Sequence, residues 1–341
     1  MKKIVFPAII LVISIVFSSI PAFAFQNDNN TSRMFAVVSE FFSDDDNLKI
    51  CGDDISITDI HKLRSIRNDN DSLYIVSVSD GSNNAYVVLD IERNYIIEFA
   101  ETNSPYAQYY ESSKELYYAP MCYIAMTQEN RFINTLTGVE DNSALDTLNG
   151  RDDFIDFTAN NRYNRIPNNP VRSYPSSAYI INVPSYAPTT TYGDICTSIY
   201  NILEYWESQD EDYDDLLLYT VNQERAIINS LFSAAGGVYR ANIQEVVEEF
   251  VSSRGYSTYV ETYYNPDFDD YRYEITYTYP TPCVVGISNN YSHIYYNGTG
   301  VGYQVIGNNN FATIHNWGAT GTNFDVNINF NEVNFLASII I

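Results

Sequence analysis

The hydrophobic pattern starts with one long apolar run near the N-terminus. Lys2 and Lys3 precede this run, residues 4–20 form it, and the triplet Ala-Phe-Ala follows at residues 22–24. A positive start, an apolar stretch and a small-x-small triplet are typical of a secretory signal peptide. We therefore expect residues 1–24 to be cleaved and the mature protein to be secreted. The alternative is an uncleaved membrane anchor, and no later run is apolar enough to span a bilayer.

The next part of the chain combines one helical pattern with several strand patterns. Residues 33–44 carry apolar side chains at helical spacing and predict a short helix. Runs rich in β-branched and aromatic residues follow at 72–80, 84–92 and 94–101, and turn-forming residues separate them. The pattern predicts a small α+β domain with an antiparallel sheet over residues 25–125.

Residues 126–177 lose this regularity. The segment is rich in Asn, Pro and Ser towards its end and shows no sustained period. Such a composition is typical of a linker or a long connecting loop. We therefore place the boundary between two domains in this segment and assign residues 178–341 to the second domain.

The second domain opens with a strand-like run at residues 178–184 and then turns helical. Between residues 192 and 206 the apolar side chains fall on one helical face. They are Ile195, Ile199, Ile202, Leu203 and Trp206. Two further helices are predicted at residues 222–235 and 242–256, and the second begins with the asparagine and glutamate of a capping box.

After residue 256 the pattern becomes typical of strands. The expected strands are residues 257–264, 271–279, 282–288, 300–307, 311–318, 325–330 and 335–341. Helices first and strands second indicate an α+β fold in which the helices pack on an antiparallel sheet. The chain shows no internal repeat.

The charge excludes one class of partner. The formal net charge of the chain is -25, and no basic patch interrupts it. Such a chain repels nucleic acids and anionic lipid surfaces. The most acidic run, residues 210–215, lacks the glycine and the terminal glutamate of an EF-hand, so we expect a solvated acidic loop there.

The cysteines do not suggest a metal site. Cys51, Cys122, Cys196 and Cys283 are widely spaced, without a CxxC pair or a Cys/His cluster. We therefore expect no metal and no cofactor. A secreted protein can form disulfides, and these four residues allow three pairings, among which the sequence does not choose.

The order of a cysteine at a helix start, then histidine and asparagine in a sheet, is that of papain-like thiol proteases. Several blocks of the second domain resemble secreted bacterial papain-like cysteine peptidases of the streptopain and bacteriocin-leader type. These blocks are residues 181–206, 234–257, 282–287, 300–305 and 314–318, and residues 84–106 are similar to the family's propeptide. The resemblance implies a papain-like fold behind a propeptide-like domain.

The resemblance also assigns catalytic positions, by counting along the matched blocks. The nucleophile position falls on Asp194, the oxyanion-hole position on Pro188 and the base position on Tyr296, while Asn316 retains the orienting asparagine. A carboxylate is no useful nucleophile for peptides, a tyrosine with a pKa of about 10 is no base at neutral pH, and proline has no N–H. The chain is therefore interpreted as an inactive peptidase homologue that acts, if at all, by binding peptides or proteins.

Other interpretations stay open at this point. The chain could be an active thiol endopeptidase with Cys196 as nucleophile, His293 as base and Asn316 as orienter, although Asp194 would raise the pKa of this thiol. It could be a propeptide-type inhibitor of a partner protease, or a secreted protein of unrelated fold. The oligomeric state is not predicted.

Overall fold

We describe the protein from a computed structural model. The residues described are 29–43, 48–50, 55–65, 72–140, 174–187, 194–276, 279–288, 295–316 and 324–341. The predicted signal peptide, most of the predicted linker, Pro188 and His293 lie outside these residues, as do the side chain of Asn316 and the whole of Cys51. None of the described helices is both long and apolar enough to cross a membrane.

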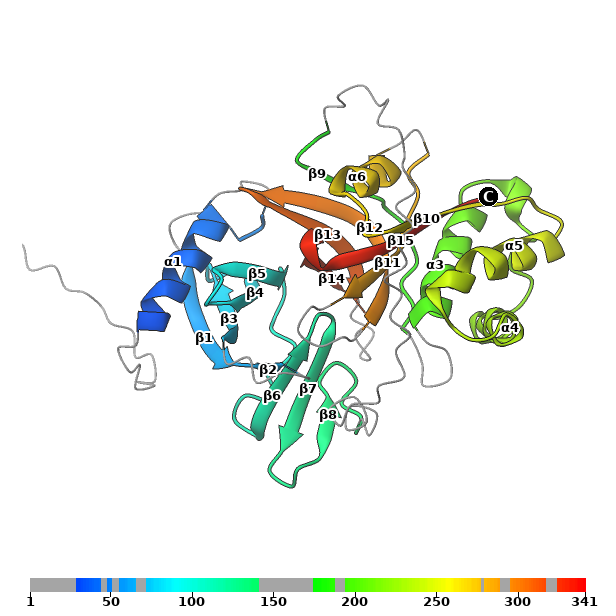
Figure 1. Ribbon diagram of the computed structural model, residues 1–341. Coiled ribbons are helices and arrows are strands. Elements are labelled where there is room, and N and C mark those ends of the chain that lie inside the picture. Colours follow the sequence, from blue (N-terminus) through cyan, green and yellow to red (C-terminus); the bar gives the residue numbers. More distant parts are fainter. Residues whose placement is uncertain are drawn as a thin grey trace, which may run out of the picture.

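A large antiparallel sheet forms the centre of the molecule (Figure 1). Its eleven strands follow the order β1-β3-β4-β5-β14-β13-β12-β11-β15-β10, with β9 paired to β12 beside this path. The strands are β1 (Ser56–Lys62), β3 (Leu73–Ser79), β4 (Asn84–Asp90), β5 (Tyr95–Ala100), β9 (Ser177–Tyr179), β10 (Tyr259–Tyr264), β11 (Cys283–Ser288), β12 (Tyr295–Ile306), β13 (Asn309–Asn316), β14 (Phe324–Asn329) and β15 (Val333–Ile340). The predicted α+β class with an antiparallel sheet is confirmed.

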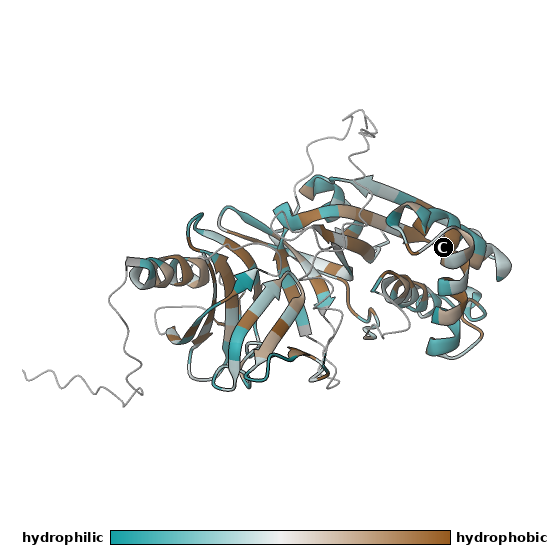
Figure 2. Ribbon diagram, turned by 60° about the horizontal axis from the view of Figure 1, so that its bottom comes forward, coloured by the Kyte–Doolittle hydropathy of each residue, from teal (hydrophilic) through white to brown (hydrophobic). Residues whose placement is uncertain are grey.

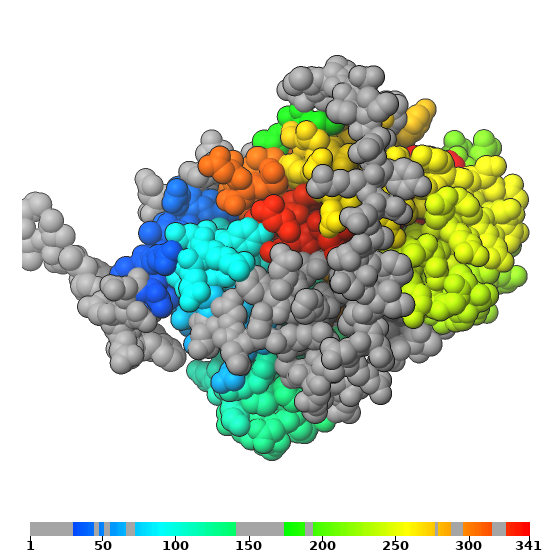
Figure 3. All heavy atoms as spheres, in the orientation of Figure 1, coloured from blue at the N-terminus to red at the C-terminus, as the bar shows by residue number. Residues whose placement is uncertain are grey.

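The sheet runs without interruption through both halves of the chain. Strand β5 pairs with β14, where Phe99 lies opposite Asn327. On one face, Phe41 packs edge-on against Phe99 and Phe311, with ring centroids 5.0 Å and 5.8 Å away. In Figure 3 the blue and cyan N-terminal residues lie on the left of the visible surface and the yellow-green residues on the right, with red C-terminal residues between them. The two predicted domains therefore share one sheet and part of one core.

A second, smaller sheet lies beside the first in the N-terminal half. It consists of β2 (Arg64–Ser65), β6 (Ser113–Ala119), β7 (Cys122–Thr127) and β8 (Phe132–Asn134), in that order. Regular structure thus continues past residue 125 into the segment predicted as a linker. All four of its strands lie within residues 64–134, so this sheet belongs to the N-terminal half, and β6 and β7 form a hairpin in it.

Buried Glu98 ties the hairpin to the large sheet. Its carboxylate accepts hydrogen bonds from the hydroxyls of Tyr86 (2.9 Å), Tyr118 (2.9 Å) and Tyr123 (2.5 Å) and from the backbone N–H of Met121 (3.2 Å). Burial raises the pKa of Glu98, and the four donors oppose that rise. A single side chain of β5 therefore satisfies donors from both strands and the turn of the hairpin.

Helices lie at the two ends of the large sheet and, in one case, over its middle strands. They are α1 (Asn29–Ser43), α3 (Asp194–Glu207), α4 (Val221–Ala234), α5 (Ile243–Ser253) and α6 (Phe268–Thr276), with the short 3-10 turns η1 (Glu211–Tyr213), η2 (Arg240–Asn242) and η3 (Phe330–Glu332). Figure 1 shows α3, α4 and α5 grouped at one end and α1 at the other. Apolar and polar bands alternate along helices and strands in Figure 2, as the sequence pattern predicts.

The predicted strand at residues 271–279 is wrong, because residues 268–276 form helix α6. The segment alternates with period two, but Tyr271, Glu274 and Ile275 are also spaced for one helical face, and these three are the buried residues of α6. Tyr271 stacks on Phe330, with ring centroids 5.7 Å apart. The helix is therefore the conformation that buries these side chains against the rest of the protein.

The predicted capping box at the start of α5 is also wrong. Asn242 makes no capping hydrogen bond with its side chain, and its amide instead donates to the carbonyls of Ala235 (3.0 Å) and Gly237 (2.9 Å). The capping box lies in α4 instead, between Thr220 and Gln223. Asn242 closes the turn before its helix because these carbonyls at the end of α4 need a donor.

Candidate functional site

The start of α3 meets strand β12 through the carboxylate of Asp194. Oδ2 of Asp194 accepts hydrogen bonds from the backbone N of Asn297 (2.7 Å) and from its Nδ2 (3.2 Å). Oδ1 accepts from the backbone N of Ile195 (2.8 Å). Burial raises the pKa of Asp194, while these donors and the charge of Arg240 oppose the rise. The residue at the predicted nucleophile position therefore joins a helix to a strand.

Arg240 completes this polar contact from the side of η2. Its Nε donates to Oδ1 of Asn297 (2.7 Å), one Nη to Oδ1 of Asn334 (2.8 Å) and the other to the carbonyl of Tyr296 (3.1 Å). Gly286 leaves the room that the guanidinium occupies, because a Cβ there would lie 2.4 Å from the Cζ of Arg240. The network connects α3, β12, β15 and η2, and each of its groups has a partner.

Tyr296, at the predicted base position, points away from Asp194. Its ring packs against Ala119 and Ile124 of the second sheet. Neighbouring strand residues face opposite sides of a sheet, so Asn297 faces the helix when Tyr296 faces the hairpin. The structure therefore brings Asn297, rather than Tyr296, to the predicted nucleophile position. An asparagine amide cannot act as a base.

Cys196, the alternative nucleophile, is buried and turned towards α4. Its side chain is 0% exposed, and its Sγ lies 3.9 Å from Oδ1 of Asn229. Burial, and then the charge of Asp194, raise the pKa of this thiol to about 11. The thiol is therefore protonated at neutral pH. Its predicted partner His293 lies outside the described residues.

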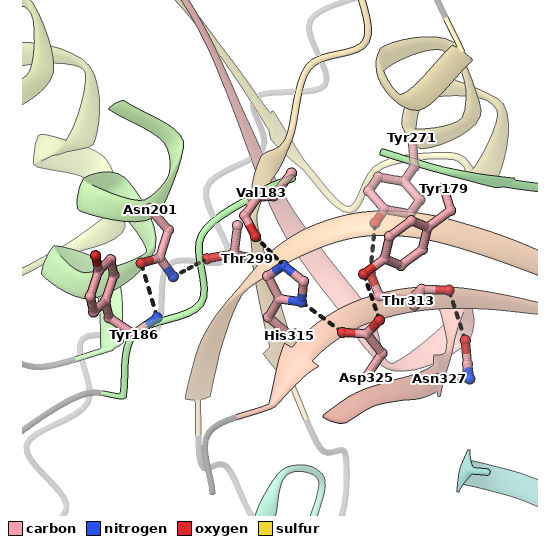
Figure 4. A network of polar contacts seen from close by, with 10 residues as sticks. All are labelled: Tyr179, Val183, Tyr186, Asn201, Tyr271, Thr299, Thr313, His315, Asp325 and Asn327. Atoms are coloured by element: carbon pink, nitrogen blue, oxygen red, sulfur yellow. Dashed lines mark hydrogen bonds and ion pairs between the residues drawn. The ribbon is translucent and has the colours of Figure 1, made fainter. Parts of the chain in front are cut away.

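His315, the neighbour of the predicted orienter Asn316, forms a polar pair that the sequence did not suggest (Figure 4). Its Nδ1 lies 2.6 Å from Oδ1 of Asp325, and its Nε2 lies 3.1 Å from the carbonyl oxygen of Val183. The hydroxyl of Tyr179 donates to Oδ2 of the same aspartate (2.7 Å). Both ring nitrogens thus face oxygen acceptors, and the imidazole holds β14 and the segment before α3 together.

The same segment is held to α3 by an amide. Oδ1 of Asn201 accepts from the backbone N of Tyr186 (3.3 Å), and its Nδ2 donates to Oγ1 of Thr299 (3.1 Å), as Figure 4 shows. Asn201 is 0% exposed, although by helical spacing it lies on the side of α3 away from the face that the sequence predicts to be apolar. Only the contact with β12 makes an asparagine suitable there, because a buried amide needs partners.

Comparison with known proteins assigns no family. No family model matches the chain, and no curated protein matches it. Among the residues that the structure describes, no group of three or more His, Cys, Asp or Glu side chains could hold a metal ion.

Proposed function

We propose that the chain is a secreted, catalytically inactive relative of papain-like cysteine peptidases. One observation carries the proposal. At the helix–strand contact where the resemblance puts a thiol and an imidazole, the carboxylate of Asp194 is held by the backbone and side-chain N–H groups of Asn297. A carboxylate with its oxygens engaged and an amide without basicity support no acyl transfer.

The other reactive groups nearby do not replace the missing pair. Cys196 faces α4, where burial and a neighbouring carboxylate disfavour the thiolate. His315 has both ring nitrogens at acceptors, and within the described part of the chain no hydroxyl or thiol is a partner of its ring. We therefore favour the inactive homologue over an endopeptidase that uses Cys196.

Binding of a peptide or protein partner is the role that such a relative retains. A separable inhibitor domain is less well supported, because the propeptide-like half contributes β1, β3, β4 and β5 to the sheet that β14 continues. We propose that both halves act together as one binding protein, without nucleic acid as a partner.

Activity-based labelling tests the proposal. The purified protein is incubated with a thiol-directed epoxide and, separately, with casein, beside Cys196→Ala and an active thiol protease as positive control. We expect neither labelling nor cleavage by the wild-type protein or the variant. Labelling and cleavage that both disappear in Cys196→Ala would show an active peptidase and contradict the proposal.

A further inference from the structure

Strand β10 forms one edge of the large sheet. It pairs with β15 alone, from Tyr259 opposite Ile340 to Tyr264 opposite Phe335, without a shift of register. Within the described part of the chain, no strand pairs with its other side. The side chains of Tyr259 and Tyr264 are 59% and 40% exposed, so the strand is accessible at both of its ends.

The pairing shows which backbone groups face outward. The backbone N of Asn265 donates to the carbonyl of Asn334 (2.8 Å), in continuation of the β10–β15 register. Hydrogen-bonded and non-hydrogen-bonded pairs alternate along an antiparallel ladder. The N–H and C=O groups of Val260, Thr262 and Tyr264 therefore point away from β15. Val260 is 4% exposed, whereas Thr262 is half-buried and Tyr264 is exposed, so Thr262 and Tyr264 present the groups that another strand would bind.

The opposite edge of the sheet carries two protective features that the described residues of β10 lack. Strand β1 has a register irregularity between Ile57 and Asp59 and ends at Lys62. Bulges and lysines are common means by which edge strands avoid pairing with other chains. The sequence of β10, Tyr-Val-Glu-Thr-Tyr-Tyr, has neither a proline nor a lysine and consists mostly of good strand formers.

Acidic residues lie near the start of β10. In η1 the ring of Tyr213 packs edge-on against Tyr256, with centroids 5.8 Å apart, and its hydroxyl donates to the carbonyl of Ile341 (3.0 Å), next to the partner of Tyr259. The exposed carboxylates around this turn are Asp210, Glu211, Asp212, Asp214 and Asp215. They attract a basic strand and repel a second copy of this acidic chain.

We infer that the outer edge of β10 binds an extended, lysine- or arginine-containing polypeptide segment by strand addition. The outward groups of Thr262 and Tyr264 supply the main-chain hydrogen bonds. The acidic turn near the start of β10 selects for positive charge. This inference does not depend on the peptidase-like site, so it survives or fails independently of the proposed function.

Peptide binding by the full mature chain tests the inference. The probe is a fluorescein-labelled peptide as long as β10 that alternates lysine and valine, and the control peptide alternates glutamate and valine. Thr262→Pro removes one outward N–H and leaves the ladder to β15 intact, and Thr262→Val keeps that N–H. Fluorescence anisotropy should show saturable binding of the basic peptide to wild type and Thr262→Val. Binding to Thr262→Pro should be weaker by about tenfold, the effect of one lost hydrogen bond.

A second variant keeps the test informative if Thr262→Pro does not fold. Asp210→Asn combined with Asp212→Asn leaves the backbone unchanged and should weaken binding several-fold at low salt, with a smaller effect at high salt. The inference is overturned if wild type does not bind the basic peptide, if it binds the acidic peptide equally well, or if folded Thr262→Pro binds like Thr262→Val. It is also overturned if sedimentation shows a dimer that Thr262→Pro dissociates, because the edge would then serve a second copy.

Discussion

At the scale of single residues, the contact between Asp194 and Asn297 determines the chemistry of the α3–β12 junction. The carboxylate accepts two hydrogen bonds from one strand residue and a third from its own helix. A thiol could not accept these bonds with comparable strength, because hydrogen bonds to charged acceptors are stronger. The carboxylate of Asp194 therefore stabilises the α3–β12 junction more than a thiol at the same position would.

Paired substitutions test this geometry in a Cys196→Ala background. Asp194→Cys places a thiol at the helix N-terminus, and Asn297→His adds an imidazole on the strand face towards it. We expect the double variant to react with a thiol-directed epoxide at least about tenfold faster than Asp194→Cys alone, since a positioned base activates a thiol. Labelling followed by mass spectrometry measures the rate.

The matched control moves the imidazole by one residue. Asp194→Cys with Tyr296→His should react no faster than Asp194→Cys alone, because residue 296 packs towards Ala119 and Ile124. Equal rates for the two histidine variants would contradict the assignment of Asn297 to the helix side. Circular dichroism of each variant shows that the fold is retained.

At the scale of elements, the β6–β7 hairpin depends on polar contacts as well as on packing. Three of the four donors to Glu98 belong to this hairpin or its turn. At the turn, Met121 has a φ of 62°, and its Cε would lie 3.2 Å from a Cβ on Gly298. The tip of the hairpin thus contacts β12, and the hairpin is hydrogen-bonded to Glu98 of β5.

Removal of one donor should measurably loosen the hairpin. Tyr118→Phe deletes a hydrogen bond to a buried carboxyl group, so we expect the free energy of unfolding to fall by about 1–3 kcal/mol. Tyr259→Phe, at an exposed ring, should change it by less than about 0.5 kcal/mol. Urea denaturation compares the two variants with wild type. A loss no larger for Tyr118→Phe than for Tyr259→Phe would show that the Glu98 contacts contribute little.

At the scale of the whole molecule, the junction of the two halves contains a second buried carboxyl group. Glu332 of η3 is 5% exposed and lies near Tyr95 and Arg93 of the N-terminal half. Burial raises the pKa of Glu332 from 4.5 to about 7, against the opposing effects of these two neighbours. The stability of the junction is therefore expected to depend on pH.

The direction of this pH dependence follows from how many protons Glu332 binds in the folded and the unfolded protein. Between pH 4.5 and about 7 the folded protein keeps a proton on Glu332 that the unfolded chain releases, so the stability from this group is lost as the pH rises through that window. The loss amounts to about 3 kcal/mol for such a shift. Glu332→Gln should reduce the pH dependence by about 2.5 kcal/mol between pH 5 and pH 8, since part of the loss occurs below pH 5. Urea denaturation at both values measures this. An identical pH dependence in wild type and variant would contradict the assignment.

The sequence by itself determined most of the local elements. The apolar face of α3, the strands of both halves and the α+β class follow from side-chain periodicity over one or two turns or a few strand residues. It also placed Asp194 at the start of a helix. Where two periods fitted the same residues, as in α6, the local pattern did not decide between helix and strand.

Only the tertiary structure decided what these elements bring together. The facing of Asn297 towards Asp194, the pairing of His315 with Asp325 and the junction of β5 with β14 all depend on strand register between distant segments. A shift of register by one residue turns each side chain to the other face of a sheet, so a count along the sequence that errs by one names the wrong partner. Burial then sets the protonation of Cys196, Glu98 and Glu332, and burial is a property of the packed chain alone.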